Sequence, residues 1–246
     1  MCYMAVSATL MRMRPVGVLW GLVLWLTLTA AATADFTYAR QLIQRGEYAL
    51  AAVTLKKQLQ EDPLEARALL AEVHLYEGDV NAALRYLESA RQLGLSEKRY
   101  YALKGRIALL QGEWDAAWAA LRSAVALSGS GADALFWGTV GLAQGNLERA
   151  QLGYEKAARS GLSAQAGFLQ GLALLSERPQ QALALLRAAQ TELTAEDPLK
   201  PQVIYWQARA LERLGNAKEA RSTLRFLLRS YPGYTPAREA LNRLGP

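Results

Sequence analysis

The chain contains a single histidine, His74, and a single cysteine, Cys2, so the side chains that most often act as nucleophilic partners or metal ligands are almost absent. A Ser-His-Asp triad needs an imidazole held by its neighbours, and a protein zinc site usually needs several histidine or cysteine ligands. A lone histidine on a helix is expected to pack against its neighbours or to lie partly exposed. The sequence therefore predicts no metal site and no catalytic centre built on histidine.

Two acid pairs, Glu61-Asp62 and Glu196-Asp197, are the remaining groups that could perform acid–base chemistry. Each pair is followed by a proline, which is typical of a turn between helices, where acids accept backbone hydrogen bonds. A two-carboxylate hydrolase needs its acids to face each other across a cleft, and successive turns do not provide that. The glycines of 129–145 follow no phosphate-binding pattern. We therefore predict that the chain is not an enzyme and needs no cofactor.

The elements that must position any functional residue follow from a repeat with a period near 34 residues. A small residue recurs at spacings of 32, 34, 33, 32 and 38, a glycine stands five residues before five of the six, and a large apolar residue stands four residues after each. The alanines are Ala51, Ala83, Ala117, Ala150, Ala182 and Ala220. The glycines are Gly46, Gly78, Gly112, Gly145 and Gly215. The large residues are Leu55, Leu87, Leu121, Tyr154, Leu186 and Leu224.

This spacing predicts stacked helical hairpins. The glycine ends the first helix of each hairpin because it adopts the left-handed conformation readily. The alanine lets the two helices approach to about 8–10 Å where they cross. The facing position on the first helix is also small, with Gln170 as the exception. Its small residues are Ala39, Ala71, Gly105, Gly138 and Ala208.

These residues resemble the tetratricopeptide repeat family over roughly residues 36 to 244. The first unit reads GEYALAAVTLKKQLQEDP and the third reads GEWDAAWAALRSA. The fifth unit departs from the pattern, because Pro179 stands near the turn in place of the glycine. The resemblance implies an all-α solenoid of about six hairpins that winds into a right-handed superhelix with a concave groove. The tail TPAREALNRL, with an apolar stripe and a charged outer side, fits a C-terminal capping helix.

Residues 1–34 do not continue the repeat. Arg12 and Arg14 precede the apolar run VGVLWGLVLWLTLTA, and an A-x-A sequence ends at Ala34, which is typical of a secretory signal peptide. An uncleaved anchor in the inner membrane is the alternative, since the apolar run approaches the length that spans a bilayer. The start at Met11 or Met13 also stays open. We expect a solenoid domain of residues 35–246, periplasmic or secreted, with Cys2 removed alongside the signal.

The charge is uneven along the chain. The formal net charge is +6, and loss of Arg12 and Arg14 would leave about +4. From Lys200 to the end, nine bases stand against three acids, so this part carries most of the excess. A solvated helix face is the simpler interpretation, and a dock for an acidic protein, anionic lipid or glycan is the alternative. An exported chain without a clustered basic arm is not expected to bind nucleic acid.

The resemblance also implies which side chains line the concave groove, namely two recurrent positions of each first helix. The lysine, asparagine and arginine combinations of the family's carboxylate-clamp members are absent there. The middle units offer small residues, where the backbone of a bound segment could approach, and two arginines could bracket a carboxylate. The alternative is that the glycines only loosen a weak helix. The predicted partner-binding residues are Arg40, Glu72, Arg106, Leu135, Thr139, Gly167, Gly171, Tyr205 and Arg209.

Two functions are consistent with these features. The first is a non-enzymatic scaffold of the bacterial cell envelope that binds a protein or peptide segment in the groove and serves assembly, secretion, pilus or cell-wall machinery. The second is an adaptor to a membrane or glycan surface that acts through the basic C-terminal part. Salt distinguishes them, because surface electrostatics fade within a Debye length of about 8 Å at physiological salt.

Overall fold

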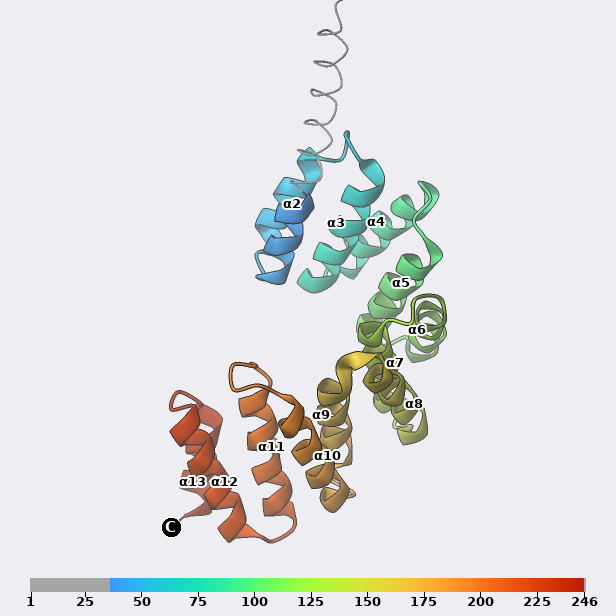
Figure 1. Cartoon of the computed structure of the whole chain (residues 1–246). Coiled ribbons are helices and arrows are strands. Elements are labelled where there is room, and N and C mark those ends of the chain that lie inside the picture. Colours follow the sequence, from blue (N-terminus) through green and yellow to red (C-terminus); the bar gives the residue numbers. More distant parts are fainter. Residues whose placement is uncertain (1–35, 246) are drawn as a thin grey trace, which may run out of the picture. The chain divides into compact units, whose positions relative to one another are not determined.

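The computed structural model describes residues 36–245, and all regular structure within them is helical (Figure 1). The predicted signal peptide or anchor, the start methionine and Cys2 lie outside these residues. Contacts within the chain define two compact units, with the boundary between Leu95 and Ser96, and each unit is described by itself. None of the helices within residues 36–245 is long and apolar enough to cross a lipid bilayer.

The first unit contains two helical hairpins. Its helices are residues 36–44, α2 (Tyr48–Lys57), α3 (Pro63–Glu77) and α4 (Val80–Gln92). Asp62 caps α3 by accepting a hydrogen bond from the Glu65 backbone N–H at 3.1 Å, and Asp79 caps α4 in the same way. These caps satisfy N–H groups that have no partner within their own helix.

The second unit contains four further hairpins and a final helix. Its elements are α5 (Glu97–Gln111), α6 (Trp114–Ser128), α7 (Gly131–Ala143), α8 (Leu147–Ala157), η2 (Ala158–Leu162), α9 (Ser163–Leu174), α10 (Pro179–Glu192), α11 (Lys200–Arg213), α12 (Ala217–Ser230) and α13 (Thr235–Leu244). Each helix packs against the next along the chain (Figure 1). The η2 segment links α8 to α9 and contains a sharp change of direction at Gly161, where φ is 87°.

The predicted repeat is confirmed in both units. All six recurrent alanines are at most 2% exposed, and so are the six large residues that follow them. The five turn glycines have φ between 68° and 79°, a left-handed conformation that a residue with a side chain adopts only at a cost. The all-α fold of six hairpins is therefore present within residues 36–245, and α13 closes it.

The capping role of α13 is visible in its packing. Ala237 and Ala240 are fully buried against Leu224 and Leu227 of α12, whereas Arg238 and the other charged residues of α13 face outward. A solenoid leaves its last apolar face open unless such an element covers it. The tail sequence thus forms the polar-backed cap that its pattern predicts.

The helices α7 and α8 of the second unit approach each other closely at their glycines. A Cβ atom built on Gly153 would lie 2.2 Å from the Gly138 nitrogen, and one built on Gly141 would lie 2.4 Å from the Ala150 nitrogen. Each of these glycines therefore lies against the backbone of the partner helix. This contact is closer than the alanine at the crossing alone predicts.

Candidate functional site

The predicted groove residues fall into both units. Arg40 and Glu72 lie in the first unit and the other seven lie in the second. Arg40 is exposed, and its guanidinium lies 2.6 Å from the Glu65 carboxylate of α3. Glu72 is half-buried on α3. Their role in binding a partner stays a prediction.

The two arginines expected to bracket a bound carboxylate are already paired within the chain. Arg106 of α5 donates to Asp133 of α7 at 2.7 Å, and the pair is mostly buried, with side-chain exposures of 18% and 8%. The same guanidinium lies over the Phe136 ring, 4.6 Å from its centroid. Arg209 of α11 pairs with Glu212 of the same helix. A carboxylate from a partner would have to displace the chain's own acids.

Three further predicted residues also have internal neighbours. The Thr139 hydroxyl donates to the Leu135 carbonyl at 2.9 Å, one turn back along α7, and both side chains are half-buried. The Tyr205 ring on α11 lies 5.8 Å from the Tyr234 ring, between centroids. Burial, and to a lesser extent the nearby Tyr205, raises the pKa of the Tyr234 phenol. The contact between the Tyr205 and Tyr234 rings joins α11 to the residue that directly precedes α13.

The expected position of Gly171 on the groove floor is wrong. A Cβ on Gly171 would lie 2.7 Å from the Leu186 Cγ of α10, so this glycine occupies the helix crossing. It corresponds to Gly105 and Gly138, which face Leu121 and Tyr154 in the same way, and Gln170 is not the small-residue position. Gly167 also faces α10, at ordinary contact distance.

The wrong placement of Gly171 comes from a shift of one residue in the alignment of the fifth repeat. In the other repeats the small residue of the first helix precedes the recurrent alanine by 12 positions, as Gly138 precedes Ala150. In the fifth repeat the turn between the two helices is shorter, and Gly171 precedes Ala182 by 11 positions. The two positions that correspond to the groove pairs of the other units are therefore Phe168 and Leu172.

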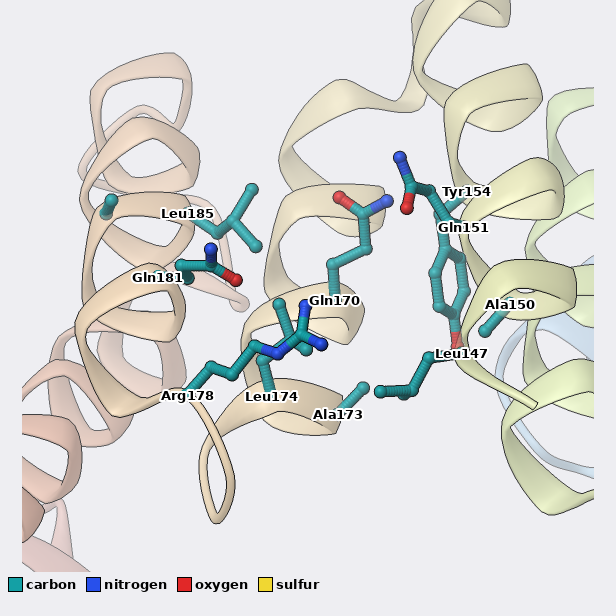
Figure 2. A pocket seen from close by; sticks show the side chains of 11 residues that line it. Leu147, Ala150, Gln151, Tyr154, Gln170, Ala173, Leu174, Arg178, Gln181 and Leu185 are labelled. Carbon is teal, nitrogen blue, oxygen red and sulfur yellow. The ribbon is translucent and has the colours of Figure 1, made fainter. Parts of the chain in front are cut away.

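A groove of about 510 Å³ lies elsewhere in the second unit, between α8 and α10, with α9 as its floor (Figure 2). We call it the α8–α10 groove. Its walls are mostly aliphatic, three glutamines, one arginine and one tyrosine carry its polar groups, and no acid lines it. The lining residues are Leu147, Ala150, Gln151, Tyr154, Gln170, Ala173, Leu174, Arg178, Gln181, Ala184 and Leu185. Its floor residues face away from Phe168 and Leu172 around α9, since 3.6 residues make one helical turn.

Ala173 lines this opening with a small side chain. In the second, third and fourth repeats, the residue two positions after the small residue of the first helix is β-branched and at most 1% exposed. Val140, for example, belongs to the buried cluster that includes Ala117 and Leu121 of the preceding second helix. The equivalent in the fifth unit is Ala173, which is half-buried and lines the groove. The sixth unit also has an alanine, Ala210, but there it is fully buried.

Arg178 is the second unusual residue of this groove. It is the N-cap of α10, where the other five units have an acid or an asparagine, namely Glu47, Asp79, Glu113, Asn146 and Asn216. A cation at the positive end of a helix is unfavourable by about 0.3–1 kcal/mol. The Arg178 guanidinium extends into the groove (Figure 2) and forms no hydrogen bond or ion pair with any residue of 36–245.

Tyr154 forms the deep end of the α8 wall. Its hydroxyl is buried and lacks a hydrogen-bond partner within the described part of the chain. Burial raises the pKa of this phenol, and the nearby Thr139 hydroxyl opposes the shift more weakly. The Thr139 hydroxyl donates its proton to the Leu135 carbonyl, and no hydrogen bond forms between the two hydroxyls.

Three of the groups considered for catalysis, His74, Asp62 and Asp197, make contacts within the chain. The His74 ring stacks on Tyr86 with 5.4 Å between centroids, and its Nδ1 lies 3.0 Å from the Glu77 carboxylate. Asp62 caps α3, and Asp197 accepts the Leu199 backbone N–H at 2.8 Å. Within residues 36–245 no group of three or more histidine, cysteine, aspartate or glutamate side chains could hold a metal ion.

Comparison with solved structures identifies the fold. PilF of Pseudomonas aeruginosa is 21% identical, with 87% of this chain and 98% of PilF covered at a TM-score of 0.64. PilW, described as a widely conserved type IV pilus biogenesis factor, is 15% identical, with coverage of 86% and 98% and a TM-score of 0.71. YrrB, described as a TPR protein with an unusual peptide-binding site, is 18% identical, with coverage of 76% and 96% and a TM-score of 0.52.

No protein-family model matches the chain, and comparison with curated proteins finds no significant match. The assignment of the fold therefore depends on the repeat pattern, the buried positions it places and the likeness to these structures. The repeat pattern, the buried positions and the likeness to solved structures agree along nearly the whole described chain. The chain is an α-solenoid with the fold of the tetratricopeptide repeat proteins.

Proposed function

We propose that the chain is a non-enzymatic scaffold of a bacterial cell envelope that holds a segment of another envelope protein. The observation that carries this proposal is the end-to-end likeness to PilW, which is described as a type IV pilus biogenesis factor. Assembly, secretion, pilus or cell-wall machinery are the settings in which such a scaffold acts. The likeness to YrrB, with its peptide-binding site, supports a peptide segment as the bound species.

The location in the envelope is part of the proposal. The basic residues, apolar run and Ala34 of the N-terminal sequence favour export, with a mature solenoid domain that starts at Asp35. Retention as an anchor in the inner membrane is the alternative. Either form exposes residues 35–246 to the envelope, where a partner segment can reach the solenoid.

Fractionation of cells and site-specific photo-crosslinking test the function. We expect the protein in the envelope fraction, with an N-terminus at Asp35 if the signal is cleaved. A photoreactive residue at Gln181 of the second unit should crosslink to a discrete envelope protein, whereas one at exposed Arg122 of α6 should not. Full-length protein in the cytoplasm, or no discrete crosslink from a panel of positions over both units, would contradict the scaffold function.

A second candidate function is an adaptor to an anionic surface, favoured by one face of α12. Lys218, Arg225 and Arg229 lie on that face, are exposed, and form no hydrogen bond or ion pair among the described residues. Phe226 beside them is 45% exposed. Flotation with vesicles that contain anionic lipid tests this candidate, and binding should disappear at high salt because the Debye length shrinks to about 3 Å at 1 M.

A further inference from the structure

We propose that the α8–α10 groove is a docking site for a short apolar peptide segment that carries one acidic side chain, with the carboxylate at Arg178. This inference rests on the proposed scaffold function and names the chemistry of the bound segment. It places the site between second helices of the fourth and fifth repeats. The first-helix positions expected from the sequence lie on a different face of α9.

The groove has the dimensions and lining that such a segment requires. Its volume of about 510 Å³ lies within the range of roughly 300–1,000 Å³ that ligand pockets occupy. Leu147, Leu174 and Leu185 provide apolar contacts from three helices, so apolar side chains of the segment would be removed from water there (Figure 2). The amides of Gln170 and Gln181 lie at the groove as donors and acceptors for the backbone of the segment.

Charge selects an acidic segment over a neutral or basic one. Arg178 is the only charged residue that lines the groove, and its guanidinium is unpaired among the described residues. It stands at the N-terminus of α10, whose first turn contains no acid and whose N-cap side chain makes no capping hydrogen bond. The guanidinium and the positive end of the helix therefore both favour an anion at one place.

Two departures from the chain's own repeat pattern meet in this groove. The buried position that is Val73, Ile107 or Val140 in the second, third and fourth repeats is Ala173 here, which leaves space. The N-cap that is acidic or asparagine elsewhere is Arg178 here, which adds an unpaired cation. The cation at the helix N-terminus is locally unfavourable, and a site that departs from the chain's own pattern in two places at once is expected where binding occurs. The two residues come from different elements, α9 and the start of α10, so the coincidence is spatial.

An array of eight-residue peptides tests the proposal with the full chain. Two positions of each peptide are fixed as leucine and phenylalanine, one position between them is glutamate, glutamine or lysine, and the remaining positions are randomised. We expect glutamate peptides to be enriched over lysine peptides, and the best glutamate peptide, labelled with fluorescein, then serves for anisotropy titrations. Failure of the glutamate series to exceed the lysine series would overturn the proposal.

Substitutions that follow the chain's own repeats locate the binding. Ala173→Val restores the side chain found at Val140 and should fold normally while it weakens binding of the labelled peptide by about tenfold or more, since it fills the groove. Ala184→Trp, on the exposed wall of α10, should have the same effect by a different route. Ala188→Trp, exposed one turn further along α10 and outside the groove, is the matched control.

The charge is tested in the same way. Arg178→Gln should weaken the glutamate peptide roughly 3- to 10-fold, whereas Arg187→Gln, an exposed arginine of α10 outside the groove, should not. Arg178→Glu should reverse the preference to the lysine peptide. Equal binding by wild type, Ala173→Val and Ala184→Trp would overturn the proposal. If crosslinks from panel positions outside the groove survive in those variants, the scaffold function stands and only the groove assignment fails.

Discussion

Three glycine-to-alanine substitutions, at Gly153, Gly167 and Gly171, separate helix propensity from helix packing. All three glycines lie inside α8 or α9, and none of them is among the glycines with positive φ. Alanine is favoured over glycine in a helix interior by about 0.8–1.0 kcal/mol. That gain is common to the three sites, so the differences between them measure what the new methyl group contacts.

The space at each site determines the expected sign. At Gly167 the added Cβ lies 3.4 Å from the Leu185 carbonyl oxygen and 3.5 Å from the Ala189 Cβ, which is ordinary contact, so Gly167→Ala should stabilise by about 0.5–1 kcal/mol. At Gly153 the Cβ would lie 2.2 Å from the Gly138 nitrogen, and the backbones of α7 and α8 must separate. Overpacking of this kind costs about 1–3 kcal/mol or more, so Gly153→Ala should destabilise by about 2 kcal/mol after the propensity gain.

Gly171→Ala should fall between these two. Its Cβ would meet the Leu186 side chain at 2.7 Å, and a side chain can move more readily than a backbone, so the net effect is near zero to about 1 kcal/mol destabilising. If Gly171 were on an open groove floor, its substitution would instead stabilise as much as that of Gly167. The order of the three variants therefore tests the corrected register of the fifth unit.

Urea unfolding followed by circular dichroism and by tryptophan fluorescence measures the three variants. Within the described residues the fluorescence reports on α6, α7 and α11, which contain Trp114, Trp118, Trp137 and Trp206. With a urea m-value of about 2–3 kcal/mol/M, the midpoints of Gly153→Ala and Gly167→Ala should differ by roughly 1 M. Equal midpoints for these two variants would refute the close α7–α8 contact. Transitions that differ between the two probes would show that the repeats unfold in steps, and each probe would then be compared separately.

Further predictions concern stability and pH. Ala117→Leu should overpack a fully buried helix crossing and cost about 1–3 kcal/mol, whereas exposed Arg122→Ala on the same helix should change stability by less than about 0.5 kcal/mol; urea midpoints decide this. The raised pKa of Tyr154 means that the folded state holds the phenol proton more tightly, so this contribution is complete below about pH 10 and is lost as the pH rises through the folded pKa. Tyr154→Phe should therefore reduce the loss of unfolding free energy between about pH 7 and pH 11, and an unchanged loss would assign it to other groups. Asp133→Asn should cost about 1–3 kcal/mol because it leaves the half-buried Arg106 without its carboxylate, and a midpoint like that of wild type would contradict the pairing.

The fold was accessible from the sequence because each unit repeats the same physical requirements. A buried small residue such as Ala117, a left-handed glycine such as Gly112 and a large residue such as Leu121 recur at fixed spacing, and one unit supports the interpretation of the next. The pairing of Arg106 with Asp133 was not accessible in this way. It joins residues 27 positions apart in successive units, and the period does not specify which charged side chains of neighbouring helices meet.

The α8–α10 groove was missed for a specific reason that concerns the fifth unit. Counting back a constant 12 residues from Ala182 reaches Gln170, and only the turn before Arg178, which is one residue shorter than in the other repeats, moves the crossing to Gly171. Once Gly171 is aligned with Gly138, Ala173 occupies the position of Val140, and the sequence then shows that the side chain at this position is smaller. The shortened turn directly precedes Arg178, so the change that hid the register lies beside the cation that lines the groove. A repeat that breaks its own pattern is therefore both the hardest to align and the most informative about binding.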